Sequence, residues 1–333
     1  MPLNFFVNTY AGNPLDRRSD LRLEADWLAA RREDPATRLI VSWNGQPLLR
    51  DREGGPGFVQ PEPAAAWSVR PPEAGGGLEL VRLEPALGFR LAGAEENVLF
   101  LGLDVGLDGE AAVFAIDVID PADPTAGPLQ GHGKFVDLRF AGGQMSPQDA
   151  GIAATAKALF EWKRRHPFCS ACGQRSEAAD AVWKRICPAC KVEHFPRTDP
   201  VTIMLPTFQD NCLLGRQAAW PKGRFSTLAG FLEPGESIEA GCAREVKEEA
   251  GLTVVSVRYH SSQPWPFPSN LMIGLIAEVS DQQATPDQTE LEEVRWFTRE
   301  EMGRLLKGQI EGLGVPPPFA IAHQLMQAWA SGG

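Results

Sequence analysis

The chain has 333 residues, of which 43% are hydrophobic and 23% are charged, values typical of a globular protein with two domains or two domains plus a small module. Its 32 basic and 43 acidic residues give a net charge of −11, which argues against binding nucleic acid through a general basic surface. The N-terminus has no basic segment followed by an apolar stretch, and the apolar run 271–277 is far shorter than the ~20 residues of a membrane span. We therefore expect a soluble, cytoplasmic protein.

The first part of the sequence, residues 1–162, is predicted to be a β-rich domain that ends in a linking helix. A short helix is expected over about residues 20–32, before Pro35. Ser146 followed by Pro147 is a strong start for a second helix, which runs to about Arg165. Apolar stretches typical of strands occur at residues 38–42, 78–83, 97–103 and 112–119. This half contains no catalytic cluster, so we expect it to serve in dimerisation or to shape one wall of a substrate site.

Four of the six cysteines form two pairs, Cys169-x-x-Cys172 and Cys187-x-x-Cys190, with 14 residues between the pairs. Two such turns that face each other make a tetrahedral sulfur cage, which suits one structural Zn²⁺ and leaves no open position for catalysis. Two disulfides are the alternative, but they require an oxidising compartment. We therefore predict a zinc ribbon over residues 163–198. The remaining two cysteines, at positions 212 and 242, lie in apolar surroundings and are expected to be core thiols.

Strands and helices alternate in the last part, residues 199–333. Strands are expected at 201–205, 212–216, 254–259, 271–279 and 294–297, and helices over 238–250, from 298 onward, and up to about 329. Gly251 is a natural end for the first of these helices, and Thr298 opens a capping box for the second. Because helices are available for both faces of the strands, the pattern predicts a layered α/β/α domain.

An acidic cluster lies on the helix predicted over 238–250. Glu245, Glu248 and Glu249 are spaced i, i+3 and i+4, so their carboxylates share one face and repel one another. A hard divalent cation relieves this repulsion, and ligands that are all oxygen favour Mg²⁺ or Mn²⁺ over Zn²⁺. Arg244 can hold one of the carboxylates in place. The alternative is a solvated acidic helix face.

The spacing from Gly230 through Glu236 and Arg244 to Gly251 satisfies every position of the pattern G-x5-E-x7-R-E-U-x-E-E-x-G-U, where U is aliphatic. The chain thus resembles the Nudix hydrolases, which cleave nucleoside diphosphates linked to another moiety. This resemblance implies an α+β protein in which a Nudix α/β/α sandwich with a mixed sheet is preceded by the zinc ribbon and the β-rich domain.

A proline-rich array, Ser262-Gln-Pro-Trp-Pro-Phe-Pro, begins eleven residues after Gly251. Alternating prolines make a stiff, extended loop, which we expect to present Trp265 and Phe267 as surfaces for stacking on a planar heterocycle. The alternative is a loop packed on the core. The array resembles the signature of the NADH pyrophosphatase subfamily, except that Asn270 stands where serine is usual.

The resemblance implies further site residues. Phe195 and Phe231 would flank the bound base, with core packing as the alternative. The backbone carbonyl of Ala229 and the carboxylate of Glu290 would bind the catalytic metal together with the three helix glutamates, and Glu293 is a rival to Glu290. Substrate contacts are implied for Arg139, Gln263, Pro264, Trp265, Pro266, Phe267, Pro268, Ser269, Asn270 and Ala322.

The implied reaction is hydrolysis of the pyrophosphate of NADH or NAD to a nicotinamide mononucleotide and AMP. Two or three Mg²⁺ or Mn²⁺ ions would assist it, and Glu248 or Glu249 would help to deprotonate the attacking water. The resemblance also implies removal of NAD caps from RNA 5′ ends and a homodimer. The alternatives are another Nudix substrate, such as ADP-ribose or a dinucleoside polyphosphate, and a nucleotide or RNA binder without catalysis.

Overall fold

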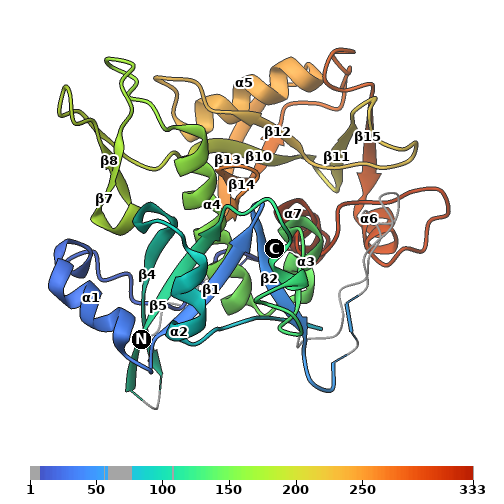
Figure 1. Ribbon diagram of the computed structural model, residues 1–333. Helices are drawn as coiled ribbons and strands as arrows, with labels where there is room; N and C mark the ends of the chain where they lie inside the picture. The colour runs from blue at the N-terminus through green and yellow to red at the C-terminus, as the bar shows by residue number, and fades with distance from the viewer. Residues whose placement is uncertain (1–7, 56, 59–76, 107–108, 333) are drawn as a thin grey trace.

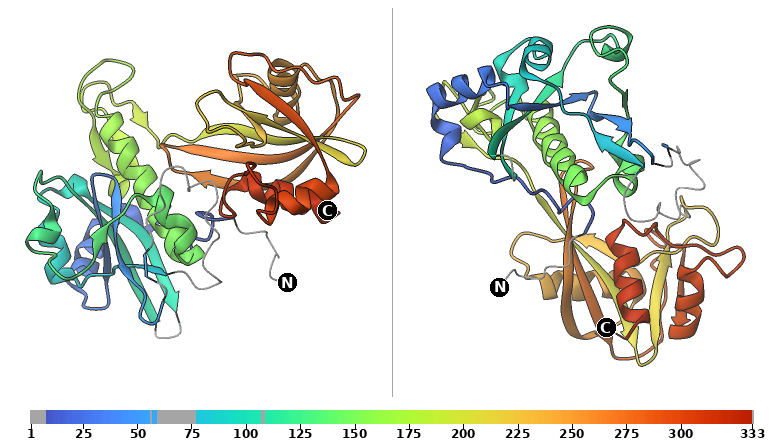
Figure 2. Two further views of the ribbon diagram at one scale, coloured as in Figure 1. Left: turned by 90° about the vertical axis from the view of Figure 1, so that its right-hand side faces the viewer. Right: turned by 90° about the horizontal axis from the view of Figure 1, so that it is seen from below.

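The structure is a computed structural model, and it describes residues 8–55, 57–58, 77–106 and 109–332. Figure 1 shows the order of the elements, and the views in Figure 2 separate a lobe that holds the N-terminal sheet from a lobe that holds the C-terminal sheet. A small three-stranded module lies on the N-terminal lobe (Figure 2). Across these described ranges, no helix combines the length and apolarity needed to cross a bilayer.

The N-terminal lobe is built on a mixed sheet with strand order β3-β2-β1-β5-β4, in which β6 pairs with β2. Its strands are β1 (Arg38–Trp43), β2 (Gln46–Asp51), β3 (Leu78–Leu80), β4 (Val98–Gly106), β5 (Gly109–Val118) and β6 (Lys134–Phe135). Its helices are α1 (Ala25–Glu33), α2 (Pro85–Gly88), α3 (Leu138–Ala141) and α4 (Pro147–Arg165). The four predicted strands are therefore confirmed, whereas β2 and β6 were not predicted.

Helix α4 begins where the sequence predicts. Ser146 Oγ accepts a hydrogen bond from the Asp149 amide at 3.1 Å, and Pro147 occupies the first turn, where its missing N–H is not needed. The buried face of α4, which includes Ile152 and Phe160, shares one hydrophobic core with side chains of β4 and β5. The linking helix is thus also the helix that covers the N-terminal sheet.

The small module contains β7 (Glu177–Ala179), β8 (Lys184–Ile186) and β9 (Glu193–His194), which pair in that order. These strands are short, and the loops at their ends carry the cysteine pairs. A sheet of this size buries too little apolar surface to be stable alone, so its folding depends on another cross-link.

The C-terminal lobe has a mixed sheet with strand order β13-β14-β10-β11-β15, in which β12 pairs with β10. Its elements are β10 (Asp199–Phe208), β11 (Asn211–Arg216), β12 (Leu228–Phe231), α5 (Ile238–Ala250), β13 (Val254–Trp265), β14 (Asn270–Val279), β15 (Glu293–Thr298), α6 (Arg299–Leu306) and α7 (Ile321–Ala330). One face of the sheet packs on α5 through Cys242 and Val246, and the other packs on α6 and α7 through Met302 and Leu325. This is the predicted α/β/α sandwich, and Cys212 and Cys242 are fully buried core thiols.

The two sheets repeat one topology, which the sequence analysis did not detect. In the N-terminal lobe β4 is antiparallel to β5, β5 is parallel to β1, and β1 is antiparallel to β2. In the C-terminal lobe β13, β14, β10 and β11 follow the same order and directions. Where the second lobe has the long helix α5, the first has only α2 and short 3₁₀ turns between β3 and β4. The N-terminal lobe therefore lacks the helix on which the acidic cluster is built.

Candidate active site

Helix α5 places the acidic cluster against β12. Ser237 Oγ caps its start by accepting a hydrogen bond from the Ala240 amide at 3.2 Å, and Gly251 ends it with a φ of 72°. With these ends, Glu245 and Glu249 turn inward and are only 8% and 4% exposed, whereas Glu248 is exposed. One helix face therefore carries two buried carboxylates and one at the surface.

Arg244 holds the preceding loop to this helix. Its guanidinium donates two hydrogen bonds to the Glu236 carboxylate, at 2.7 and 2.9 Å, and one to the Phe231 carbonyl at 2.9 Å. It also donates to Glu245 at 2.8 Å and to Glu248 at 2.9 Å. Hydrogen bonds from Arg244, followed by one from a loop amide, lower the pKa of Glu236 to about 2. Arg244 thus holds Glu245 and Glu248 by single hydrogen bonds, and its bidentate partner is Glu236, outside the acidic cluster.

The first glycine of the motif is required by close packing. A Cβ atom at Gly230 would lie 1.8 Å from the carboxyl carbon of Glu245, well inside any contact distance. Only a residue without a side chain lets the Glu245 carboxyl group lie directly against β12. The glycine therefore determines where this carboxylate stands.

Glu249 carries an uncompensated carboxylate. Its Oε2 atom is buried, with no hydrogen-bond partner in the part of the chain that the structure describes. Burial raises the pKa of Glu249 to about 8, and the charges of Glu245, Glu290 and Asp287 add to the effect. Burial likewise raises the pKa of Glu245. An orphaned buried carboxylate oxygen beside further acidic side chains is a donor that a hard divalent cation satisfies, so the chemistry of these residues fits Mg²⁺ or Mn²⁺, although among the described residues no three carboxylates lie within 4.8 Å of one another.

The structure separates the two candidates for the distal metal ligand. Glu293 forms an ion pair with Arg216 at 3.3 Å, so its carboxylate already has a cationic partner. Glu290 lies on a turn in which Asp287 accepts its backbone N–H at 3.0 Å, and its charge acts on both Glu245 and Glu249. These contacts favour Glu290.

A cavity of about 530 Å³ opens beside Glu249, between the two lobes. It brings together residues far apart in sequence, namely Arg139, Phe140, Gly143, Gln144, Ile203, Trp220, Thr227, Ala229, Glu249, Gln263, Trp265, Met272, Phe319 and Ala322. Five of the residues singled out from the sequence (Arg139, Ala229, Gln263, Trp265 and Ala322) thus share a wall with Glu249. Since α3 supplies Arg139, the N-terminal lobe does shape one side of this cavity.

The proline-rich array is not the free platform that we expected. Its first half continues β13 as far as Trp265, whose ring stacks on Phe319 at 6.3 Å and meets Tyr10 edge-on at 5.9 Å. Phe267 also contacts Tyr10, and the Arg139 guanidinium lies 5.6 Å from the centre of the Phe267 ring. Both rings pack against the core of the N-terminal lobe. Both rings are thus partly buried at the seam between the lobes, where apolar rings gain from burial, and because Trp265 also lines the cavity, stacking on a substrate stays a prediction for it.

Gln263 joins three segments. Its side-chain amide donates to the carbonyls of Thr9 and Phe319, at 3.1 and 2.8 Å, and accepts from the Ile321 amide at 2.9 Å. The residue is fully buried, so these bonds occupy its polar atoms. Gln263 therefore ties the N-terminal segment and the start of α7 to β13, although it was expected to contact substrate.

The rest of the array faces a second, smaller hollow. Pro264, Pro266, Ser269 and Asn270 line it together with Trp183. Ser269 also donates a hydrogen bond to Asp199 at 2.9 Å. Pro268 follows a cis peptide bond. The expected contact residues are thus divided between two sides of the array.

Phe195 and Phe231 are not core residues. They are 64% and 57% exposed, and neither lines the cavity of about 530 Å³. Phe231 ends β12, and Phe195 follows β9. Core packing, the alternative weighed for both, is therefore excluded, and both rings are accessible to a planar group.

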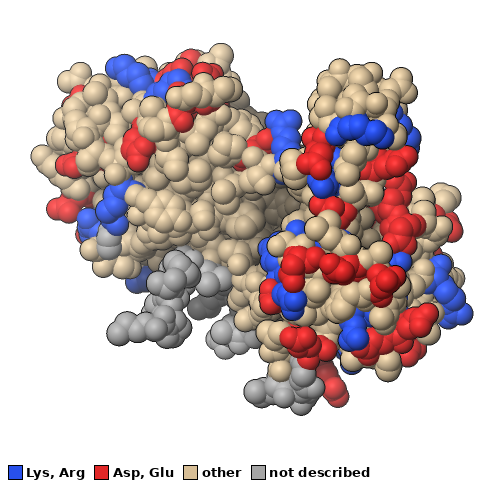
Figure 3. All heavy atoms as spheres, turned by 90° about the vertical axis from the view of Figure 1, so that its left-hand side faces the viewer, with Lys and Arg blue, Asp and Glu red and all other residues tan. Residues whose placement is uncertain are grey.

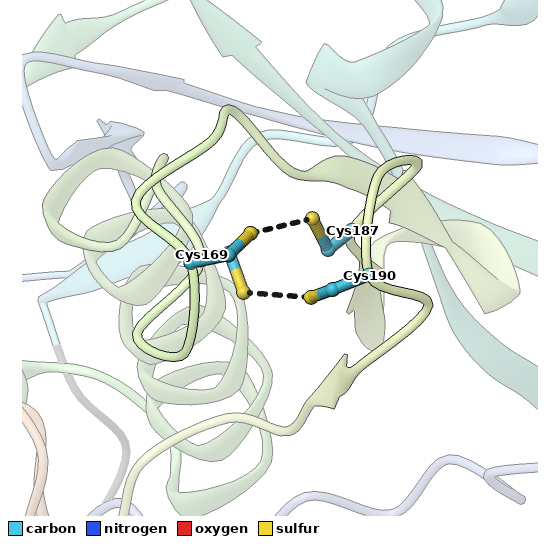
Figure 4. Close-up of side chains that lie close together, drawn as sticks. Cys169, Cys187 and Cys190 are labelled. Atoms are coloured by element: carbon cyan, nitrogen blue, oxygen red, sulfur yellow. Dashed lines mark hydrogen bonds between the residues drawn. The ribbon is translucent and has the colours of Figure 1, made fainter.

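The four paired cysteines form one cluster at the end of the small module. Their sulfurs all lie within 4.8 Å of one another, and the contacts Cys169–Cys190 and Cys172–Cys187 are 3.5 Å (Figure 4). These distances are far from the ~2.05 Å of a disulfide and close to the edge of about 3.8 Å expected for a zinc tetrahedron with 2.3 Å bonds. The four thiols form no disulfides, and together they hold structural Zn²⁺.

The two halves of the zinc site have the same backbone. The amide of Gly173 donates to the Cys169 carbonyl, and the amide of Lys191 donates to the Cys187 carbonyl, each at 2.9 Å. Gly173 and Lys191 have φ values of 75° and 63°, so both loops turn through a left-handed residue. The spacing of each pair is therefore set by a tight turn that aims two thiols at one point.

Comparison with known proteins agrees with this anatomy. Residues 197–313 match the NUDIX domain, residues 36–162 match the NADH pyrophosphatase-like rudimentary NUDIX domain, and residues 164–195 match the NADH pyrophosphatase zinc ribbon domain. The match to a rudimentary domain accounts for the repeated sheet topology and the missing helix in the N-terminal lobe.

Three relatives illustrate the extent of the similarity. The NAD-capped RNA hydrolase NUDT12 of Macaca fascicularis is 36% identical over 98% of this chain and 73% of its own length. The human mitochondrial NAD(P)H pyrophosphatase NUDT13 is 38% identical over 76% of each chain. The NAD-capped RNA hydrolase NudC of Mycobacterium bovis is 40% identical over 59% of this chain and 65% of its own. The chain therefore belongs to the Nudix hydrolase family, among the NADH pyrophosphatase-like members that join a rudimentary Nudix domain, a zinc ribbon and a complete Nudix domain.

Proposed function

We propose that this protein hydrolyses the pyrophosphate bond of NADH or NAD and releases a nicotinamide mononucleotide and AMP. The observation that carries the proposal is the buried carboxylate of Glu249, whose Oε2 atom has no hydrogen-bond partner among the described residues and which lies at an interdomain cavity and within an intact Nudix motif. Similarity along nearly the whole chain to an NAD-capped RNA hydrolase supports the dinucleotide as substrate.

The catalytic cations would be held by Glu245, Glu248, Glu249, Glu290 and the carbonyl of Ala229. When bound, Mg²⁺ or Mn²⁺ neutralises the pyrophosphate charges and lowers the pKa of a water. The unsatisfied oxygen of Glu249 and its acidic neighbours account for the affinity of this position for a cation.

Side chains of the protein orient the carboxylates, accept a proton and bind the phosphates. Arg244 keeps Glu245 and Glu248 oriented through its two short contacts with them. Either Glu248 or Glu249 accepts the proton of the attacking water. Arg139, which lines the cavity and is paired with Asp137 at 2.7 Å, is the cation that we propose to meet the phosphates.

The cavity accepts one nucleoside half of the substrate. Its volume of about 530 Å³ is in the range of small-molecule sites, and most of its wall is apolar. The other half faces Phe195 and Phe231, which lie outside the cavity and are exposed. This open side leaves room for an RNA chain attached to the dinucleotide, so we propose NAD-capped RNA as a second substrate. ADP-ribose and dinucleoside polyphosphates remain the alternative substrates.

We further propose a homodimer that functions in the cytoplasm. β13 is an edge strand of the C-terminal sheet, and it exposes Val255 and Tyr259, each at 59%. Figure 3 shows a broad area with few charges on the C-terminal lobe, whereas charged side chains crowd the other lobe and the zinc module. An exposed apolar edge of this kind is suited to a second copy of the chain. Reduced zinc-binding thiols are in keeping with a cytoplasmic location.

The deciding experiment follows AMP release from NADH in Mg²⁺ with the purified protein. We expect Glu249→Gln to slow release by at least a hundredfold, and the exposed control Glu278→Gln to leave it unchanged. If the wild type and Glu249→Gln release AMP equally slowly, the catalytic assignment is wrong. The same assay with NAD, NAD-capped RNA and ADP-ribose ranks the substrates, and light scattering of the protein in solution measures its oligomeric state.

A further inference from the structure

The segment that leads into β12 places Thr227 on the cavity side of the sheet. Phe225 and Ala229 belong to the apolar cluster under α7, whereas Leu228 belongs to the cluster under α5. Side chains along an extended strand alternate between faces, so Thr227 shares the face of Phe225 and Ala229. Thr227 accordingly lines the cavity beside Glu249.

The hydroxyl group of Thr227 has no partner. The residue is 6% exposed, and its Oγ1 atom is buried without a hydrogen bond among the described residues. Two equally buried threonines on β10 do have partners: Thr202 donates to the Gly230 carbonyl at 3.3 Å, and Thr207 donates to the Ala277 carbonyl at 3.5 Å. Buried hydroxyls are almost always hydrogen-bonded, because an unpaired one loses its hydrogen bonds to water and gains none within the protein. The unpaired hydroxyl at a cavity wall therefore points to a ligand group as its partner.

The position of Thr227 along the strand indicates which part of the ligand it meets. It lies two residues before Ala229, whose backbone bonds the Glu249 carboxylate at the metal end of the cavity. Two strand residues span about 7 Å, which leads beyond a metal-bound phosphate to the adjoining ribose or base. The cavity is also lined by the apolar residues Ile203, Met272 and Ala322, and by a few polar side chains that include Ser226 and Gln217.

We propose that the Thr227 hydroxyl hydrogen-bonds the ribose or base of the nucleoside half that enters the cavity, and thereby determines substrate specificity. The proposal rests on the proposed dinucleotide hydrolysis. A buried hydroxyl without an internal partner discriminates well, because a ligand without the matching group leaves it unpaired.

The test compares Thr227→Val with the wild type in NADH hydrolysis. Valine has nearly the same shape and removes only the hydroxyl, so we expect KM to rise five- to tenfold while kcat changes less than twofold. We expect no loss of stability in urea unfolding, since no internal bond is broken. Thr227→Ser should restore most of the affinity. The matched control Thr207→Val removes a hydroxyl that has a partner, and it should lower stability without changing KM.

Product inhibition then locates the contact. For Thr227→Val, the inhibition constant of either nicotinamide mononucleotide or AMP should rise five- to tenfold while the other stays unchanged. An unchanged KM in an active protein would overturn the proposal, because the hydroxyl would then bind only water. Equal rises for both mononucleotides would also overturn it, since they would place the contact on the phosphates. A wild type that releases no AMP would instead refute the dinucleotide hydrolysis itself.

Discussion

The raised pKa of Glu249 predicts an unusual pH dependence of stability in protein without catalytic metal. The pKa is about 8 in the folded protein, against an ordinary value of 4.5, so the folded state binds the proton more tightly than the unfolded state does. Between these two values the folded state carries more protons, and stability falls as pH rises. At about 1.4 kcal/mol per pKa unit the full loss is at most about 5 kcal/mol, and coupling to neighbouring carboxylates reduces it to about 2–4 kcal/mol.

The assay is thermal unfolding at pH 5 to 9 in buffer freed of divalent metal, with the zinc content verified as one per chain. We expect the wild-type Tm to fall by on the order of 10 °C across this range, beyond the fall of Glu249→Gln, which lacks this titrating carboxyl group. Glu248→Gln is the matched control, because it removes an exposed carboxylate from the same helix face and should behave like the wild type. Addition of Mg²⁺ at pH 8 should restore the Tm of the wild type but not that of Glu249→Gln. If the wild type and Glu249→Gln lose stability in parallel, the buried carboxylate is not the cause and the reasoning is refuted.

Three further predictions follow from the packing. Gly230→Ala should lower kcat for AMP release by at least a hundredfold, because its Cβ would displace the adjacent carboxyl group, whereas Gly303→Ala, with nothing within 4 Å, should be neutral; equal activity of both would refute the packing argument. Cys190→Ser should reduce bound zinc, measured by elemental analysis, from one per chain to none, whereas Cys212→Ser should keep it. If Cys190→Ser retains its zinc, Cys190 is not a zinc ligand. Gln263→Leu should cost about 2–4 kcal/mol in urea unfolding, since it leaves three buried backbone groups unpaired, and a loss below about 1 kcal/mol would contradict its joining role.

The sequence analysis predicted helix ends and the zinc site correctly, because these features depend on interactions between residues that are close together in the sequence. The ends of α5 depend on Ser237 and Gly251, and the capping box of α6 depends on Thr298 and Glu301, all of which bond within four residues. The cysteine pairs likewise need only two short turns to bring their thiols together. Such contacts form in any protein that has the same local sequence, so sequence alone predicts them.

The proline-rich array is a feature whose contacts could not be predicted from local sequence. Its prolines do stiffen the chain, but stiffness alone does not say what the rings meet. Tyr10 and Phe319, which flank Trp265, are 255 and 54 residues away, and no local pattern links them. The sequence therefore could not show that Trp265 packs between these two rings while it also lines the cavity. The repeated sheet was missed for the same reason, since it consists of strand pairings between distant segments.

The sequence by itself determined that this is an acidic chain with a zinc module and a divalent-metal motif, because both kinds of ligand come from residues a few positions apart. The net charge of −11 already carried part of this information, since residues 230–251 and residues 287–301 each carry a net charge of −4. Only the tertiary structure decided that Glu249 is buried with an unsatisfied oxygen, that Gln263 joins three segments, and that Thr227, which lines the cavity, has a buried hydroxyl without a partner among the described residues. Burial and hydrogen-bond partners belong to the packing of whole lobes against each other, so they become visible only when distant parts of the chain are brought together.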